Sequence, residues 1–293
     1  MPLGAAAIST SGILIRLTQS SPLVTASNRL LWAGAILLLW AVCTERRALA
    51  ALRPRDVALL ATSGVLLGLH FALWTSSLFQ TSVASAVFLT DTHPIMVALI
   101  ALLFLGERTA VRVWLGIGAT LLGSAIIGYG DFRLGASTLL GDLTAGGASI
   151  TFAGYLVIGR HARQLISVAA YAGLVYSIGG IVIVLLELAN RTDIGAFSSR
   201  DALLWLGLVL APTLGGHTVF NWALRYVPVS VVGVAILGEP VGTTVLAWVV
   251  LGEPPGALDV LGGAVILVGV LLALTSPSVP SLPSAGVPIA DVR

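Results

Sequence analysis

The sequence predicts an all-α polytopic membrane protein, with ten transmembrane helices arranged as two inverted repeats of five. The prediction rests on an apolar composition, on long apolar segments, and on a similarity between the two halves of the chain. Of the 293 residues, 57% are hydrophobic and 10% are charged, and the mean hydropathy is +1.01. A soluble domain carries about 25% charged residues, so a water-soluble enzyme, a disordered chain and a coiled coil are excluded. Continuous apolar runs favour membrane helices over the alternating strands of a barrel.

Charged and proline-rich breaks divide the chain into ten apolar segments. Most are long enough to cross about 30 Å of hydrocarbon as helices. The N-terminus lacks the basic region of a secretory signal peptide, so the first segment is interpreted as a membrane helix. After the tenth segment, residues 276–293 are rich in Pro and Ser and are predicted to form a disordered cytoplasmic tail. The predicted segments are 3–18, 27–44, 57–78, 82–105, 111–129, 142–160, 166–188, 202–223, 229–251 and 257–275.

The arginines predict the orientation, because short cytoplasmic loops are enriched in positive residues. All 15 basic residues are arginine, and ten fall on the side that holds both termini. Both termini are therefore expected in the cytoplasm. The protein itself is expected in the inner (plasma) membrane of the cell. The single Cys43 excludes an internal disulfide and a cysteine metal cluster, and no cofactor or metal is expected. The other side is assigned five arginines: Arg16, Arg29, Arg133, Arg191 and Arg200.

An internal repeat appears when the chain is shifted by 146 residues. Nine of the thirty positions 94–123 are then identical, with Pro94 on Pro240 and Leu105-Gly106-Glu107 on Leu251-Gly252-Glu253. His70 and His217 come into register with a one-residue slip. Apolar composition alone would not easily align a proline and a glutamate at one spacing.

The repeat predicts how the two halves are oriented. Each half carries five segments, an odd number, so the second half begins on the opposite side of the membrane from the first. The two similar halves must therefore have opposite orientations in the membrane. The predicted units are residues 1–130 and 131–275. Inverted repeats are typical of transporters, in which the two halves exchange conformations around a central site. An old duplication retained only for packing is the alternative.

The paired motifs around Pro94 and Pro240 resemble the EamA pattern of the drug/metabolite transporter superfamily. That pattern is a proline followed by Leu-Gly-Glu near the end of each half, and then a glycine-rich fifth span. The resemblance covers about residues 3–275 and implies a central cavity lined by spans 1, 3, 4, 6, 8 and 9. It also implies export of amino acids or other metabolites, or import of small solutes. The placement of aromatic and polar residues is most similar to the YddG-type exporters of aromatic and neutral amino acids.

Ionisable residues inside membrane spans are costly, so each needs a structural or functional explanation. The fourth span carries Asp91, His93 and Pro94, and the ninth carries Glu239 and Pro240. Proline lacks an amide hydrogen and clashes with the preceding turn, so both spans are expected to be kinked, with the prolines as gating positions. Broken helices at mid-membrane commonly form substrate sites. The alternative is that these groups only hold neighbouring helices together.

Polar and aromatic stripes on three other spans complete the candidate substrate site. His70 and Trp74 share a face of the third span, and His217 and Asn221, continued by Arg225, share a face of the eighth. Such stripes should face a cavity or another helix and not lipid. On the sixth span, Phe152 and Tyr155 would contact an apolar or aromatic ligand. The proposed substrate-binding residues are His70, Trp74, Asp91, His93, Phe152, Tyr155, His217, Asn221 and Glu239.

Some polar residues have a structural explanation that is at least as good. Trp74 and Trp222 also fit an interfacial aromatic belt. Arg16 either attracts a carboxylate or snorkels towards water. Glu107 and Glu253 are interpreted as helix-end residues. The glycines of the fifth and tenth spans suit close packing, either within the protomer or in a homodimer.

The sequence therefore predicts a secondary transporter in the lipid bilayer that exports small metabolites, with aromatic or neutral amino acids as substrates and no nucleic acid partner. Acidic groups would bind the ammonium group of the substrate. Polar groups of spans 3 and 8 would bind its carboxylate. A carrier of another solute, such as a nucleobase, carboxylate or drug, is the first alternative. A membrane-embedded lipid-modifying enzyme is disfavoured because no zinc-protease or nucleophile-elbow motif occurs. A channel is disfavoured because no filter motif repeats.

Overall fold

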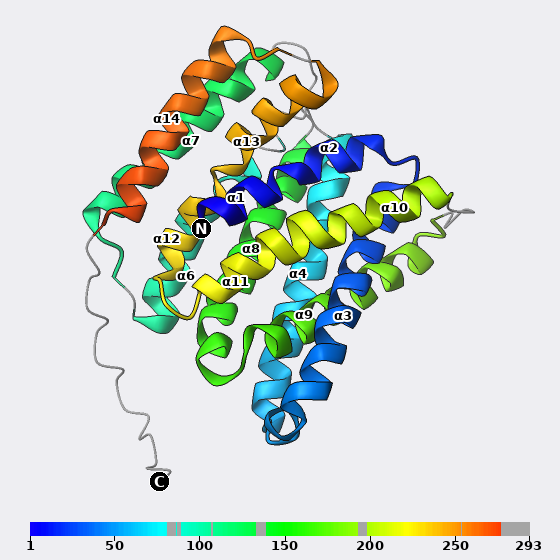
Figure 1. Cartoon of the computed structure of the whole chain (residues 1–293). Helices are drawn as coiled ribbons and strands as arrows, with labels where there is room; N and C mark the ends of the chain where they lie inside the picture. Colours follow the sequence, from blue (N-terminus) through cyan, green and yellow to red (C-terminus); the bar gives the residue numbers. More distant parts are fainter. Residues whose placement is uncertain are drawn as a thin grey trace.

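The computed structural model describes residues 1–80, 86, 89–106, 108–132, 139–192, 198–252 and 254–276. Within these ranges every regular element is a helix, which confirms the predicted all-α class (Figure 1). The predicted tail lies outside the described residues from residue 277 onward, as do Glu107 and Glu253.

The helices match the ten predicted segments, although four of those segments are broken in two or three. Five of the described helical segments are long and apolar enough to cross a membrane, and four shorter helices are also apolar. The sixth segment, α8, has 27 residues but is rich in Gly, Ser and Thr, and it lies against α4, α6, α9, α11 and α12. The elements are α1 (Pro2–Ile8), α2 (Thr10–Leu17), α3 (Pro22–Ala50), α4 (Pro54–Gln80), α6 (His93–Leu105), α7 (Val111–Phe132), α8 (Leu139–Leu165), α9 (Val168–Ala189), α10 (Ser199–Leu208), η1 (Val209–His217), α11 (Thr218–Ala223), α12 (Val229–Ile236), α13 (Glu239–Leu246), η2 (Ala247–Leu251) and α14 (Ala257–Leu274).

Helices α3 and α9 are equivalent in the repeat and pack side by side, as Figure 1 shows. A Cβ added to Gly34 would lie 2.6 Å from the Ser177 backbone nitrogen, and one added to Gly180 would lie 2.7 Å from Leu31. Shifted by 146, Leu31 falls on Ser177 and Gly34 on Gly180, so the two contacts are exchanged by the repeat. Such reciprocity means that a two-fold axis passes between the helices. The contacts run in opposite directions along them, so the two halves are inverted.

Helices α7 and α14 form a second reciprocal pair, at the upper left of Figure 1. A Cβ on Gly116 would lie 2.7 Å from the Gly269 carbonyl oxygen, and one on Gly123 would lie 2.6 Å from the Gly262 carbonyl oxygen. Gly116 is equivalent to Gly262 and Gly123 to Gly269, so this pair obeys the same two-fold relation. These glycines therefore pack within the protomer, because only the absence of a side chain lets the two backbones approach this closely.

The fourth and ninth spans are broken at equivalent places. Turns at residues 91–92 and 237–238 separate the short helices, and α6 and α13 then begin at His93 and Glu239. Both prolines therefore occupy the first turn of a new helix, where a missing amide hydrogen costs nothing. Each span ends at a glycine with positive φ, which is 64° at Gly106 and 71° at Gly252.

The first and eighth spans are also broken, which the sequence analysis did not predict. Ser9 interrupts the first span, and its carbonyl oxygen accepts a hydrogen bond from the Thr243 hydroxyl at 3.1 Å. In the eighth span Pro212 lies within the π-helix η1, and the Thr213 hydroxyl donates to the Leu208 carbonyl oxygen at 2.7 Å. Because proline cannot donate a backbone hydrogen bond, the pattern shifts and the side chain replaces part of it.

One assignment from the sequence is wrong. Arg29 does not report orientation, because it lies within α3 and is only 2% exposed. The apolar segment was expected to start at residue 27, but α3 begins at Pro22, where the Ser21 side chain caps it. Arg163, assigned to the side that holds both termini, is buried within α8 in the same way. Nine arginines on one side are then opposed by four on the other, and the cytoplasmic placement of the termini stays a prediction.

We expect the substitution Gly116→Ala to destabilise the protein by about 1–3 kcal/mol, because its methyl group would overlap the α14 backbone. Gly118→Ala is the matched control, since a Cβ at that position meets no described atom within 4 Å. Thermal unfolding of the purified protein in detergent measures both effects. Equal melting temperatures for the two variants would contradict the proposed α7–α14 contact.

Candidate functional site

His93 lies where the broken fourth span meets the ninth. Pro94 prevents normal continuation of the helix, and the Thr90 carbonyl oxygen instead lies 3.2 Å from His93 Nδ1. The other ring nitrogen, Nε2, lies 3.3 Å from the Gly233 carbonyl oxygen on α12. A neutral imidazole carries one N–H and donates to only one of these two acceptors. His93 therefore joins the two halves at the position where both helices are interrupted.

Phe152 on α8 is the centre of an aromatic cluster that contains three histidines. Its ring centroid lies 4.5 Å from that of His70, 4.9 Å from His93 and 6.5 Å from His217. Phe71 lies 6.1 Å from His217 and closes the cluster on the α4 side. These rings come from α4, α6, α8 and the end of η1, so both halves contribute. The prediction that the repeat-related histidines share one region is consistent with this arrangement.

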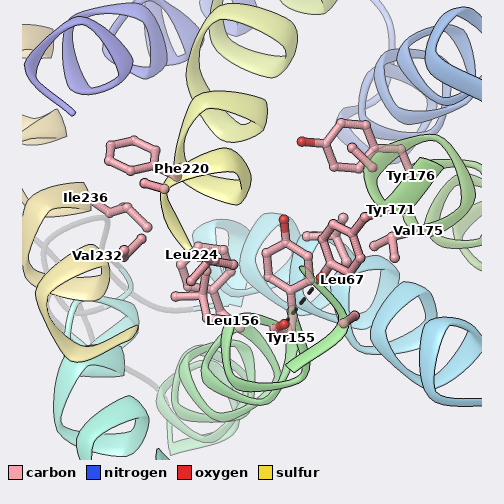
Figure 2. Close-up of a cluster of buried hydrophobic side chains, with 14 of the residues drawn as sticks. Leu67, Tyr155, Leu156, Tyr171, Val175, Tyr176, Phe220, Leu224, Val232 and Ile236 are labelled. Atoms are coloured by element: carbon pink, nitrogen blue, oxygen red, sulfur yellow. Dashed lines mark hydrogen bonds between the residues drawn. The ribbon is translucent and has the colours of Figure 1, made fainter. Parts of the chain in front are cut away.

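A chain of hydrogen bonds connects this cluster to a group of buried tyrosines. The Tyr155 hydroxyl donates to Asn221 Oδ1 at 2.6 Å, and Asn221 Nδ2 donates to the Tyr176 hydroxyl at 3.0 Å. Tyr176 and the Thr218 hydroxyl are 3.1 Å apart. In Figure 2 the Tyr155 and Tyr176 rings lie on the same side of the hydrophobic cluster, with Tyr171 between them. Asn221 is fully buried and links α8, α9 and α11.

Glu239 is the first residue of α13 and is one of the two acidic residues of the predicted substrate site. Its backbone carbonyl accepts from the Ser9 hydroxyl at 3.1 Å, which places it against the break in the first span. Its side chain is half-buried. Glu239 is the repeat equivalent of His93, so related positions carry groups of opposite chemical character.

Two other predicted site residues have contacts of a different kind. Asp91 accepts a hydrogen bond from the Ser124 hydroxyl on α7 at 3.1 Å, so it is held on the side of the outer α7–α14 pair. Trp74 is half-buried and packs against the main hydrophobic core, which includes Phe71, Phe152 and Tyr155. The structure therefore brings together His70, His93, Phe152, Tyr155, His217 and Asn221 by direct contacts, whereas Glu239 contacts the break in the first span.

The predicted stripe on the eighth span is shorter than expected. α11 ends at Ala223, so Arg225 lies in a turn and does not continue the face of His217 and Asn221. Trp222 is 50% exposed and its ring lies 4.9 Å from that of Tyr226, which fits a lipid-interface residue. The side chain of Arg16 lies outside the described part of the protein.

Arg29 is the site residue that sequence reasoning missed. Its guanidinium carbon lies 5.1 Å from the centre of the Phe71 ring, within the range of a cation–π contact. Phe71 in turn lies 6.1 Å from the His217 ring, so Arg29 borders the aromatic cluster. The sequence contained one signal for this placement, since Arg29 is followed directly by the apolar run Leu30-Leu31-Trp32.

The arrangement combines an aromatic surface with one cationic and one acidic group inside a membrane-embedded bundle. Such a site can bind a small amphipathic solute, because rings accept its apolar part and charges fix its polar groups. The fold and site together define a polytopic membrane transporter class built from two inverted halves.

Comparison with known proteins identifies the family. The sequence profile of the EamA-like transporter family matches residues 1–129 and 139–275. The chain belongs to the EamA-like transporter family, which confirms the resemblance found in the motifs around Pro94 and Pro240.

Curated relatives are named as transporters. The chain is 28% identical over 267 residues to the uncharacterized transporter YdfC of Bacillus subtilis, covering 88% of this chain and 84% of that protein. It is 24% identical over 257 residues to the pseudopaline exporter CntI of Pseudomonas aeruginosa, covering 85% of this chain and 86% of that protein. A solved structure described only as the crystal structure of a protein superposes with a TM-score of 0.75 at 16% identity. It covers 92% of this chain and 94% of that chain, and it supports the fold alone.

We expect Asn221→Ala to destabilise the protein by about 1–3 kcal/mol, because it leaves the buried hydroxyls of Tyr155 and Tyr176 without their shared partner. Asn28→Ala is the matched control, since the Asn28 amide donates to a carbonyl of its own helix, that of Val24. Thermal unfolding in detergent should separate the two variants. A similar decrease in melting temperature for both variants would mean that the Asn221 network contributes little to stability.

Proposed function

We propose that this protein is a secondary transporter that exports small organic metabolites across the inner membrane, with aromatic or neutral amino acids as its substrates. The observation that carries the proposal is the aromatic cluster around Phe152, which contains His93 at the break in the fourth span and through it contacts α12 of the ninth span. Placing a site where two inverted repeats meet is the arrangement that alternating access requires.

The side chains of the cluster suit such a substrate. Phe71 and Phe152 supply apolar ring faces, and His70 and His217 supply polar edges beside them. Aromatic rings in contact favour offset or edge-on geometries, so an aromatic substrate is expected to contact these rings in the same way. Glu239 supplies an acidic group for a substrate ammonium. These features favour a YddG-type amino acid exporter over a carrier of strongly polar solutes.

The broken helices support movement between two states. Units 1–130 and 131–275 would rock against each other about the two-fold axis, with α6 and α13 as the mobile halves of their spans. Short helices joined by turns can tilt without breaking a long hydrogen-bond ladder. A membrane-embedded enzyme is less consistent with this arrangement, and so is a channel, since neither needs inverted mobile halves.

The first test is counterflow of radiolabelled amino acids into proteoliposomes that contain the purified protein. Phe152→Ala should reduce exchange of aromatic amino acids about tenfold, since it removes the central ring of the cluster. Phe104→Ala is the matched control, because that ring is 78% exposed on α6 and lies outside the cluster. If the wild-type protein exchanges no amino acid at all, the proposed substrate class is wrong although the fold is unaffected.

The orientation is tested by reporter fusions in a bacterial host. A fluorescent protein fused to the C-terminus should fold and fluoresce, because the arginine bias predicts that both termini are cytoplasmic. Alkaline phosphatase inserted after Thr192, between α9 and α10, should be active, because that loop is expected on the opposite side. The reverse pattern of activities would overturn the proposed direction of insertion.

A further inference from the structure

Arg29 is a buried cation whose hydrogen bonding is incomplete. Nε donates to the Thr213 hydroxyl oxygen at 2.7 Å, and Nη1 donates to the Ser11 hydroxyl oxygen at 2.8 Å. The third nitrogen, Nη2, is buried and has no hydrogen-bond partner among the described residues. A buried donor without a partner is costly, and more so when it is charged. The structure therefore leaves the Nη2 amino group of the guanidinium without a hydrogen-bond acceptor.

The guanidinium is held rigidly by both halves of the protein. Ser11 belongs to α2 in the first half, and Thr213 belongs to η1 in the second. The Thr213 hydroxyl donates its own hydrogen to the Leu208 carbonyl oxygen, so its lone pair is fixed towards Arg29. Phe71 lies beneath the guanidinium at 5.1 Å. A donor fixed on three sides pays little further entropy when it binds a ligand.

The charge of Arg29 also lacks a contacting carboxylate. Among the described residues, no carboxylate oxygen lies within 4.0 Å of its nitrogens to form an ion pair. An isolated charge inside a membrane protein is expensive unless it is paired and hydrogen-bonded. A carboxylate that reached Nη2 would supply both the missing acceptor and the missing charge.

We propose that Arg29 Nη2 binds the carboxylate of the transported substrate, while Glu239 receives its ammonium group. This inference rests on the proposed function and narrows it to substrates that carry a carboxylate, with zwitterions preferred. A zwitterion is electrically neutral, so it offers a carboxylate to Arg29 and an ammonium group to Glu239 without adding net charge. The substrate side chain then lies against Phe71 and Phe152.

The experiment measures ligand binding by the purified full chain in detergent, through the intrinsic fluorescence of its tryptophans. The probes are phenylalanine, phenylalaninamide and 3-phenylpropionate, which share one ring but differ in their charged groups. The wild-type protein should prefer phenylalanine to phenylalaninamide. Arg29→Gln should weaken phenylalanine binding by about tenfold to a hundredfold, which is the effect expected from losing a hydrogen bond to a charged group. Its affinity for phenylalaninamide should change little.

Three further variants make the result specific. Glu239→Gln should weaken binding of phenylalanine and phenylalaninamide but not of phenylpropionate, which has no ammonium. Arg163→Gln is the matched control, because this buried arginine donates to the Asn221 and Ile166 carbonyl oxygens and lies outside the cluster. Since Arg29→Gln also leaves Ser11 and Thr213 without their donor, Arg29→Lys serves as a second variant that keeps the charge. It should retain a reduced preference for the carboxylate.

The outcomes separate this inference from the proposed function. Equal losses for phenylalanine and phenylalaninamide in both Arg29 variants would show a purely structural role and overturn the inference. Unchanged phenylalanine binding in Arg29→Gln would also overturn it. Binding of phenylpropionate but of no amino acid, lost in Arg29→Gln, would support the carboxylate site and refute the amino acid substrate. A wild-type protein that binds neither carboxylate would overturn both.

Discussion

The close approach of equivalent helices at glycine is the contact on which the rest of the structure depends. Gly34 and Gly180 bring α3 against α9, and Gly116 and Gly269 bring α7 against α14. Apolar side chains gain little by leaving lipid for another apolar surface, so helix association in a membrane needs dense contact between backbones. Because each contact recurs under the two-fold relation, the two halves are held in a fixed inverted arrangement. The broken spans lie between these pairs (Figure 1).

Broken helices are acceptable inside the bundle because side chains bind the backbone groups that the breaks release. The Thr90 carbonyl faces a ring nitrogen of His93, the Ser9 carbonyl accepts from Thr243, and the Leu208 carbonyl accepts from Thr213. Lipid offers no hydrogen bonds, so such breaks occur only where protein or water surrounds them. The polar residues of the candidate site are therefore partly a consequence of the breaks, and the site lies where the helices are interrupted.

The two-fold relation is geometric, and the chemistry at equivalent positions differs. His93 Nε2 lies 3.3 Å from a carbonyl oxygen of α12, whereas its counterpart Glu239 is acidic and contacts Ser9 through its backbone carbonyl. A symmetric scaffold lets the two halves exchange conformations, while unlike side chains give the site a direction along which a polar substrate can be oriented. His70 and His217 retain the same residue type and lie in one aromatic cluster.

The sequence alone predicted the helical class, the ten segments, the inverted repeat and the breaks before Pro94 and Pro240. These features depend on local composition and on spacing, which can be counted along the chain. It also selected most of the histidines and aromatic residues that the structure brings together.

Other features depended on tertiary structure. Arg29 was counted among the arginines of the non-cytoplasmic side, because hydropathy cannot show that a charged residue at the edge of an apolar run has hydroxyl partners on two distant helices. The direction of Asp91 towards Ser124 was likewise invisible in the sequence. The choice between packing within the protomer and packing between protomers for Gly116 and Gly269 was also decided by the fold. Each of these depends on which residues meet across helices far apart in the chain, and that is fixed by packing and not by local pattern.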